Sequence, residues 1–496
     1  MKKYILLSAA ALTLSMSACS DYLDINEDPN SPSESNLTAS MLFPSVEMQL
    51  AATYGGDLRS VAGYHAQHYS QNFGTSNYLD YSQFEMSATR CSQFYSLLNQ
   101  RCLTNIQTIL EKSIEAEDWG TYLAATTLRA FIYQTEVDCW GEIPYSEALD
   151  ATNTAPKYDD GADIYAGIIA ELDAALEKAN VSDVVCTNFL FPSASADSWI
   201  KFANALKLRI LMRESNVKDV QSQLKALVDE DNFPESDVQF ANCWTDQQGG
   251  YSPFYDNDFA SGRQVNIVAN IAIVGTMQQK DSEGNITFTD GRLGKYFNVN
   301  ESDEYTGSIS GTNFSTSNQY KSGYWCRPVA SPTMPVVLLS VAETEFFLAE
   351  YHARYGSEAD AQEHYETAIN ASFDAVGADG ADDVIAQYPF SKSNYAQILG
   401  IAKWVDLSGY NNFEAWCEMR RLGYPTFGTI KGSDMYNLQT DASYKPTLYV
   451  AGTLYTPLQV FGQVGENNVL ARYPYPESSS ARNSNTPTFP EIGRAS

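Results

Sequence analysis

Histidines are the first side chains to consider for chemistry in this chain, and they form no catalytic pattern. His65 and His68 would lie about one turn apart on a helix and could bind a metal ion. No third ligand lies nearby in the sequence, so we expect no metal site there. The chain has 4 histidines, and His352 and His364 fall in a different region, which leaves little for a histidine-based nucleophilic triad.

Carboxylates leave one enzymatic alternative open. The sequence lacks the motifs of metalloproteases, α/β-hydrolases, phosphate-binding loops and EF-hands, and no motif predicts a cofactor. A glycosidase, however, needs only two carboxylates, and Asp and Glu together number 61. A surface-anchored hydrolase is therefore the alternative to a binding protein. The formal net charge of −30 repels polyanions, so we exclude nucleic-acid binding.

Aromatic side chains in polar, glycine-rich stretches are the candidate ligand-binding groups. Irregular backbone with exposed aromatic rings is costly to keep unless the rings pack or bind a ligand. For any single ring, packing of a loop onto the body explains its presence equally well. The candidates are Tyr78, Tyr81, Trp244, Tyr251, Tyr324 and Trp325.

Helices must position these groups. Residues 119–140 carry apolar side chains at helical spacing, and Gly141 followed by Pro144 predicts the end of that helix. A second amphipathic helix follows from Ile164 to Ala179. A third, starting at Trp199, carries cations that we expect to pair with acids of neighbouring helices. Those cations are Lys201, Lys207, Arg209 and Arg213.

The clearest repeat signal lies at residues 333–377. Small and aromatic residues there fall at the offsets of a tetratricopeptide unit, which predicts two helices, 333–356 and 357–377. Together with the helical hairpins elsewhere, this predicts a mainly α fold: a tetratricopeptide-like superhelix of helical hairpins, with long irregular loops and little β structure. The residues at the repeat offsets are Leu348, Ala349, Gly356, Ala361, Tyr365 and Ala368.

The helical period fades between residues 232 and 330, where Gly, Ser, Asn, Tyr and Asp are frequent. Long irregular stretches inside compact proteins are usually functional or disordered, and the aromatic content argues against disorder. We therefore predict one domain over residues 37–496, with a loop-rich insertion at about 232–330 that holds much of the ligand site.

The N-terminus reads as an export signal. Lys2 and Lys3 precede an apolar run at residues 4–14 that is too short to span a membrane. Met16-Ser17-Ala18-Cys19 then resembles a lipobox, so we predict a signal peptide at residues 1–18 and acylation of Cys19, the first residue of a tether at 19–36. The alternative is an ordinary signal peptide cleaved after Ala18. Multiple acyl chains would anchor the protein stably.

The other cysteines number seven and are scattered, which is not the pattern of a disulfide framework. Some lie on apolar helix faces, where free thiols pack as small hydrophobes. The sequence leaves one or two bridges possible among Cys91, Cys102, Cys139, Cys186, Cys243, Cys326 and Cys417.

Several stretches stand out in chain order: LRA at 128–130 with WGEIPYSEAL at 140–149, WIKFAN at 199–204, KW, EAW and RRLGYP within 403–425, and RYPYPE at 472–477. Together they resemble the SusD/RagB family of nutrient-binding lipoproteins, surface proteins of Bacteroidetes-type bacteria. That family commonly has Gln before the lysine of the KW pair, whereas this chain has Ala402 before Lys403.

The resemblance implies capture without chemistry. SusD-like proteins form a lid on a TonB-dependent, SusC-like outer-membrane transporter and enclose an oligosaccharide or a peptide between the two. By this resemblance the chain is not an enzyme, needs no cofactor, lies lipid-anchored at the outer membrane on the cell surface, and delivers its nutrient to such a transporter. The sequence does not separate sugar from peptide, and the family offers no motif from which site residues could be transferred.

Overall fold

Helices account for most of this chain. The computed structural model describes residues 37–72, 75, 77–192, 195–311, 324–435 and 449–488. It is 52% helical with 8% strand, which confirms the predicted mainly α fold. The α-helices are α2 (Ala39–Ala52), α3 (Arg59–His65), α4 (Leu79–Ser82), α5 (Ala88–Ser96), α6 (Thr104–Glu115), α7 (Trp119–Trp140), α8 (Gly161–Leu176), α9 (Asp197–Glu214), α10 (Gln221–Glu230), α11 (Pro253–Asp258), α12 (Ile271–Met277), α13 (Leu293–Tyr296), α14 (Val341–Tyr355), α15 (Glu358–Val376), α16 (Ala381–Gln387), α17 (Tyr395–Leu407), α18 (Asn412–Leu422) and α20 (Glu477–Ser480).

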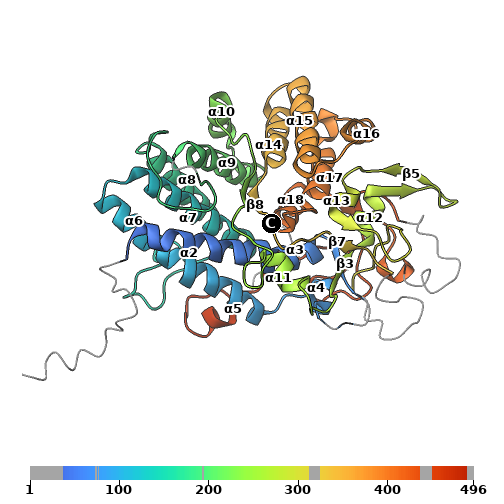
Figure 1. The fold of residues 1–496 in the computed structure, drawn as a ribbon, viewed down its shortest axis with the longest axis horizontal. Coiled ribbons are helices and arrows are strands. Elements are labelled where there is room, and N and C mark those ends of the chain that lie inside the picture. Colours follow the sequence, from blue (N-terminus) through green and yellow to red (C-terminus); the bar gives the residue numbers. More distant parts are fainter. Residues whose placement is uncertain are drawn as a thin grey trace, which may run out of the picture.

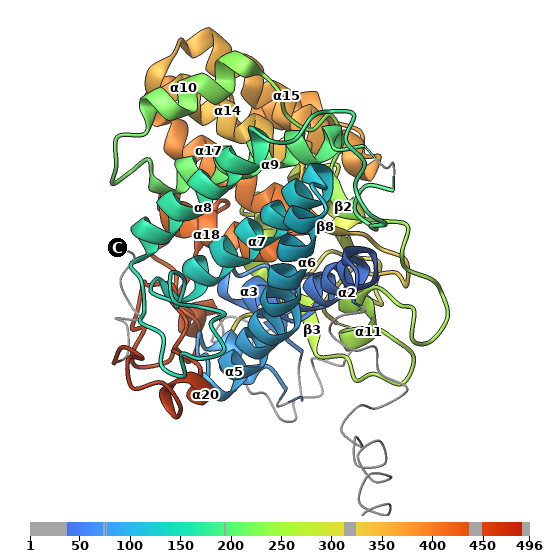
Figure 2. The same ribbon diagram turned by 90° about the vertical axis from the view of Figure 1, so that its left-hand side faces the viewer.

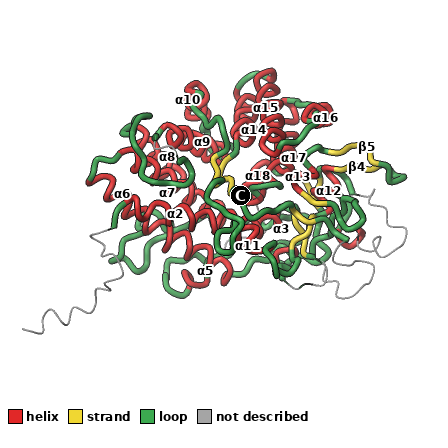
Figure 3. The backbone as a smooth tube through the Cα atoms, viewed as in Figure 1, coloured by secondary structure: helices red, strands yellow, loops and turns green. Residues whose placement is uncertain are grey.

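Short strands form two-stranded ladders only, among the described residues. Four are antiparallel, and β9 with β10 is parallel. Figure 3 shows them mostly on the side of the molecule away from α6–α8, with β4 and β5 at its margin. The pairs are β1 (Tyr69–Gln71) with β3 (Ile267–Ala269), β2 (Val238–Phe240) with β8 (Val336–Leu339), β4 (Gln278–Lys280) with β5 (Ile286–Thr289), β6 (Phe297–Asn298) with β7 (Arg327–Pro328), and β9 (Thr426–Phe427) with β10 (Thr453–Leu454).

Two pairs of consecutive helices are continuous through π-helical segments. The π-helical segments η2 (Thr53–Leu58) and η3 (Leu97–Leu103) continue α2 into α3 and α5 into α6, and η4 (Lys392–Asn394) precedes α17. Helices α6–α9 lie on one side of the molecule, and α12, α13 and most strands on the other (Figure 1). Figure 2 places α10, α14 and α15 at one end, and α5 and α20 at the other.

Local sequence explains where α7 begins and ends. Asp118 accepts a hydrogen bond from the backbone N–H of Thr121 and so caps the first turn. Gly141 ends the helix at φ +83°, in the left-handed region that favours glycine, and its N–H donates to Val137. Both the helix and its end were predicted from the sequence and are confirmed. No described helix is long and apolar enough to cross a membrane.

The predicted tetratricopeptide hairpin is α14 and α15. Ala349, Ala361 and Ala368 are fully buried, so the two helices approach closely, and Tyr365 is buried beside them. The predicted start at residue 333 was wrong. Residues 336–339 form β8, which pairs with β2, and the helix begins only after Ser340, whose hydroxyl accepts from the N–H of Glu343.

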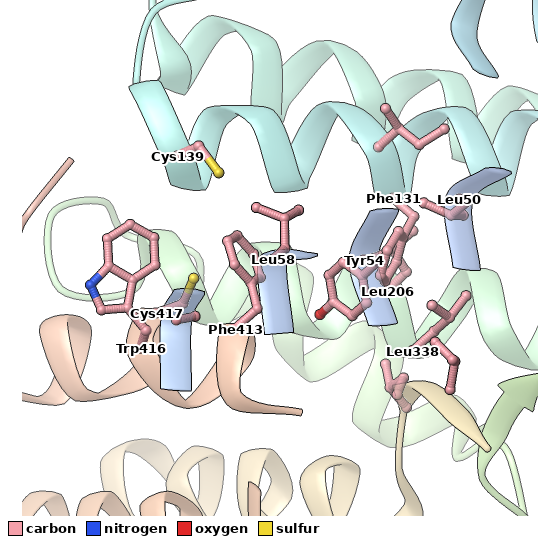
Figure 4. Close-up of a cluster of buried hydrophobic side chains, with 14 of the residues drawn as sticks. Leu50, Tyr54, Leu58, Phe131, Cys139, Leu206, Leu338, Phe413, Trp416 and Cys417 are labelled. Carbon is pink, nitrogen blue, oxygen red and sulfur yellow. The ribbon is translucent and has the colours of Figure 1, made fainter. Parts of the chain in front are cut away.

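The central core forms where helices from distant parts of the chain meet. Tyr54 packs edge-to-face on Phe131 and Phe413, with ring centroids 5.0 and 5.5 Å apart. Figure 4 shows Leu50, Tyr54 and Leu58 between α7 on one side and Phe413 and Trp416 of α18 on the other. All seven described cysteines are free thiols, so none of the bridges that the sequence left possible is formed.

A network of buried charges joins α7, α9, α14, α17 and α18. Arg209 pairs with Glu343 at 2.7 Å, and Arg213 pairs with Asp138 at 3.2 Å and Glu414 at 2.7 Å. The expected pairing with acids of neighbouring helices is confirmed for Arg209, for Arg213 and, at the surface, for Lys207, which pairs with Asp173 of α8. It is wrong for Lys201, which pairs with Glu235 in a loop and with Asp197 of its own helix. The remaining buried pairs include Lys403 with Glu418 and Arg421 with Glu350.

Residues 232–330 contain short elements from β2 to β7 that the sequence did not predict, although most of the described part of the region remains irregular. Each element is only 2 to 7 residues long, and short apolar runs of this length carry too little periodicity to be recognised. The position of these elements follows from long-range pairing. One instance is Tyr69 of β1 opposite Ala269 of β3.

Glu136 in α7 makes stability depend on pH. Burial raises the pKa of its carboxyl from 4.5 to about 8, against a hydrogen bond from Asn99. Because the folded pKa lies above the unfolded one, this group lowers stability as pH rises from about 4.5 to 8. Glu136→Gln is therefore expected to change stability little at pH 5 and to raise it by a few kcal/mol at pH 8.5.

Denaturant unfolding at both pH values measures this difference. Glu111→Gln, an exposed position on the neighbouring α6, is the matched control and should show no pH-dependent gain. An equal gain at pH 5 and pH 8.5 for Glu136→Gln would contradict the assignment.

Candidate functional site

A cavity of about 360 Å³ is lined largely by residues of the 232–330 region, which was predicted to hold much of the ligand site. We call it the Tyr324 cavity. Its size is within the range of small-molecule sites. Tyr305, Tyr324 and Tyr449 are half-buried in its wall, and Trp325 is buried behind them. The full lining is Ile271, Val274, Gly275, Gln278, Gln279, Lys280, Glu304, Tyr305, Thr306, Gly307, Tyr324, Trp325, Tyr449 and Ala451.

Two glycines shape the wall of the Tyr324 cavity. A Cβ on Gly275 would lie 2.4 Å from the Tyr449 ring, and one on Gly307 would lie 2.5 Å from the backbone of Ile271. Real side chains do not approach so closely. Glycine at these positions therefore lets the Tyr449 ring and the 304–307 segment pack directly against α12.

Hydrogen bonds fix the backbone that carries Tyr324 and Trp325. The carbonyl of Tyr324 accepts from the Thr306 hydroxyl at 2.5 Å and from the Asn300 amide at 3.0 Å. The N–H of Cys326 donates to the carbonyl of Thr306 at 3.0 Å. Segments 300–306 and 324–326 are therefore held together, and the two rings keep fixed positions at the cavity.

The lining offers neutral phenols and amides. Burial raises the pKa of Tyr324, and the charge of Glu304 raises it further, so this phenol stays protonated and can donate to a ligand. Burial also raises the pKa of Tyr305. Gln278 and Gln279 add amide donors and acceptors. Rings beside such polar groups suit a ligand with apolar faces and hydroxyl edges.

Catalytic carboxylates are sparse at the Tyr324 cavity. Glu304 is the single acid among its described lining residues, and Lys280 is the single cation. Glycoside hydrolysis needs two carboxyl groups across the scissile bond. The lining residues that the structure describes therefore provide groups for binding and include only one acid, not the two carboxyl groups of a glycosidase.

The six predicted ligand-binding residues fall into separate places. Tyr324 and Trp325 pack edge-to-face, with centroids 4.6 Å apart, and of the six only these two line the Tyr324 cavity. Tyr78 and Tyr81 stack on each other at 5.5 Å. The Tyr78 hydroxyl donates to Asp258 at 2.9 Å, and burial raises the pKa of that carboxyl to about 6.

Trp244 and Tyr251 contribute to packing of their own loop. The Trp244 indole N–H donates to the carbonyl of Phe240 at 2.9 Å, and Tyr251 packs edge-to-face on Tyr255 at 5.2 Å.

Two tyrosines that line the Tyr324 cavity, Tyr305 and Tyr449, were not predicted from the sequence. Tyr305 lies in the 232–330 stretch, which was predicted to hold much of the ligand site. Tyr449 comes from a distant segment, and no local sequence pattern connects that segment to the 232–330 stretch.

The two histidines considered as metal ligands lie inside the core. Burial lowers the pKa of His65 and of His68 to about 3, so both imidazoles are neutral. His68 hydrogen-bonds the Asn412 amide at 2.8 Å. Among the described residues one other set, Asp138, Glu414 and Cys417, could approach a metal ion.

Arg213 already neutralises that set. Its guanidinium pairs with Asp138 at 3.2 Å and with Glu414 at 2.7 Å. A second cation there would add repulsion without an unpaired acid to bind.

Comparison with known proteins identifies the family. The family model of SusD-like proteins, described as "starch-binding associating with outer membrane", matches residues 29–442. The chain belongs to the SusD-like family. No curated protein matches the sequence.

Solved structures share the fold of this SusD-like protein. A SusD homologue from Bacteroides uniformis has a TM-score of 0.67 at 22% identity, over 89% of this chain and 94% of its own. One from Bacteroides thetaiotaomicron has a TM-score of 0.67 at 20% identity, over 90% and 93%. A chitin-binding SusD homologue from Flavobacterium johnsoniae has a TM-score of 0.68 at 18% identity, over 91% and 97%.

Family membership sets the general role of this SusD-like protein. The family model describes starch-binding proteins that associate with the outer membrane, and one solved structure with this fold is a chitin-binding protein. The resemblance read from the sequence stretches is therefore confirmed at the level of the family. Cys19 and the tether at 19–36 lie outside the described residues, so acylation stays a prediction.

Proposed function

We propose that this protein captures an oligosaccharide at the cell surface, in the Tyr324 cavity. The observation that carries the proposal is the set of half-buried tyrosines, Tyr305, Tyr324 and Tyr449, in one cavity with neutral amides. Rings supply faces for sugar stacking, and amides and phenols supply partners for hydroxyl groups. The starch-binding description of the family and its chitin-binding relatives favour a glycan over a peptide.

The proposal includes the anchor and the partner. The acylated Cys19 holds the protein at the outer membrane by its N-terminus, and the bound glycan passes to a TonB-dependent, SusC-like transporter. The lipobox-like residues 16–19 support the anchor, and the outer-membrane association of the family supports the location. Residues 37–496 form one SusD-like domain in this proposal, with 232–330 as its ligand-binding insertion.

Capture proceeds without bond cleavage in this proposal. A single acid, Glu304, lines the described part of the cavity, so hydrolysis by paired carboxylates has no support there. Chromatography after prolonged incubation should return the oligosaccharide intact. Turnover that is lost in Glu304→Gln would contradict the non-enzymatic role.

Tyr324→Ala is expected to weaken glycan binding by about 1–3 kcal/mol, the scale of an aromatic hot spot. Isothermal titration with maltohexaose and with chitohexaose measures the loss, and whichever oligosaccharide the parent protein binds serves as the reference. Tyr324→Phe keeps the ring and should retain most of the affinity. Tyr122→Ala, at a half-exposed ring on α7 outside the cavity, is the matched control.

Unchanged glycan affinity in Tyr324→Ala would show that the glycan does not bind in the Tyr324 cavity. Equal losses in Tyr324→Ala and Tyr122→Ala would indicate a general effect on folding instead. If the parent protein binds neither glycan and binds a peptide, the substrate class in this proposal is wrong.

Cys19→Ala is expected to release the protein from the membrane, because the acyl chains are its only proposed anchor. Cell fractionation and labelling with a fatty-acid analogue measure the effect, and the parent protein should be labelled and sediment with membranes. Ser20→Ala, at the next residue, is the matched control and should stay membrane-bound. A Cys19→Ala protein that is still labelled and retained would refute acylation at this site.

A further inference from the structure

A second cavity, of about 440 Å³, lies between the helical repeat and the β4–β5 hairpin. We call it the Ala402 cavity. Helix α17 supplies Ala402 and three larger apolar side chains to its wall. Helices α15, α16 and α12 supply further apolar side chains. The apolar lining includes Met277, Ile369, Val384, Ile398, Ile401 and Val405.

The wall of the Ala402 cavity differs in chemistry from that of the Tyr324 cavity. Five branched aliphatic side chains are among its described lining residues, and Phe288 with Tyr388 adds an aromatic corner, with ring centroids 6.1 Å apart and planes at 88°. Apolar side chains of this kind contribute little binding energy to sugar hydroxyls, and they favour the burial of an apolar ring. Polar side chains stand at the exposed rim, where Asn394 donates to Gln397 at 3.0 Å.

The charges in this cavity are already neutralised. Asp290 and Arg292 are the only ionisable acid and base among its described lining residues, and two hydrogen bonds of 3.0 and 2.6 Å join them. Arg292 also donates to the Ser372 hydroxyl at 2.7 Å. A charged ligand would therefore find no free partner, although the chain as a whole carries a net charge of −30.

We propose that the Ala402 cavity is a second binding site, which takes a neutral aromatic group. Its volume exceeds the roughly 150 Å³ in which an engineered apolar cavity binds benzene, so a two-ring aromatic fits. The Tyr388 hydroxyl accepts from the Gln279 amide at 2.6 Å and keeps its own proton for a ligand ether or hydroxyl. This site is independent of glycan capture.

The Tyr324 cavity and the Ala402 cavity are neighbours and share part of their walls. Ala451 lines both, while Gly275 and Gln278 face the Tyr324 cavity and Thr276 and Met277 face the Ala402 cavity. The two sites remain separable by mutation, because their ring and helix residues differ.

Indole is the probe for this proposal, because it is neutral and has two rings. The full chain with Cys19→Ala is used, so that no acyl chain or detergent micelle competes for an apolar compound. Calorimetry should show saturable binding of one equivalent. Ala402→Phe fills the cavity and Ile398→Gln makes its wall polar, and each should weaken indole binding at least tenfold with native helix content retained.

Tyr324→Ala is the matched control and should change indole binding by less than twofold, just as Ala402→Phe should leave glycan binding unchanged. Unsaturable indole binding by the parent chain would overturn the proposal without any variant. Unchanged affinity in both cavity variants, or a loss confined to Tyr324→Ala, would overturn it as well. Loss of glycan binding alone concerns the proposed function and leaves this site in place.

Discussion

Arg213→Met is expected to lower the free energy of unfolding by about 3–5 kcal/mol, because it removes the cation that Asp138, Glu414 and Glu418 share and leaves Asp138 without an ion-pair partner among the described residues. Arg213 pairs with Asp138 at 3.2 Å and Glu414 at 2.7 Å, and with Glu418 at short range. Burial alone would raise the pKa of Glu418, but Arg421 and Lys403 outweigh it and hold that pKa well below its usual range. Burial raises the pKa of Glu414 to about 7 even beside Arg213 and Arg209, so ionisation of this carboxyl depends on the cations next to it.

Denaturant unfolding followed by circular dichroism measures this loss. Lys225→Met is the matched control, because Lys225 pairs with Asp229 on α10 while both side chains are about 60% exposed. An exposed pair of this kind contributes little, so the control should unfold at the same midpoint as the parent. An Arg213→Met protein as stable as the control would show that the buried network does not hold the helices together.

The network also explains the stretches that made the family recognisable. Glu414, Arg421 and Lys403 come from the EAW, RRLGYP and KW stretches, and each forms an ion pair in the network with a side chain that is at most 4% exposed. Buried cations and acids on different helices cannot be replaced singly without leaving an unpaired charge. The EAW, RRLGYP and KW stretches thus contain residues that hold the helices of the scaffold together, and they do not indicate which ligand binds.

Regular helices were predictable because their apolar faces repeat over many turns. The end of α7 at Gly141 and the α14–α15 hairpin follow from local spacing and small residues. The start of α14 was not predictable in this way. The run Val336 to Leu339 is four apolar residues long, and only its pairing with β2, about a hundred residues earlier, makes it a strand.

The candidate site was predictable only in part, for the same reason. The glycine-rich, aromatic stretch at 232–330 indicated where rings would gather, and Tyr324 and Trp325 line the cavity. Tyr78, by contrast, is engaged with Asp258 through its hydroxyl. Which rings meet depends on contacts between distant segments, such as Tyr449 against Gly275, and composition does not encode them.

Trp325→Ala is expected to cost about 3–5 kcal/mol of stability, as truncation of a buried aromatic ring does. Trp325 is 4% exposed, and besides the Tyr324 cavity it lines a neighbouring cavity of about 260 Å³. The indole thus forms the partition between two spaces, and its removal would join them. Tyr324, which is half-buried in contact with it, should show the opposite balance, with a larger loss in binding than in stability.

Thermal melts and calorimetric glycan titrations, run on the same preparations below the melting temperature, separate these effects. Trp325→Phe is the matched control, because a smaller ring keeps the partition and should lose less than half as much stability. If Trp325→Ala melts within experimental error of the parent yet no longer binds the glycan, the indole acts on the ligand directly. The partition role would then be wrong, and the stacking surface would extend from Tyr324 to Trp325.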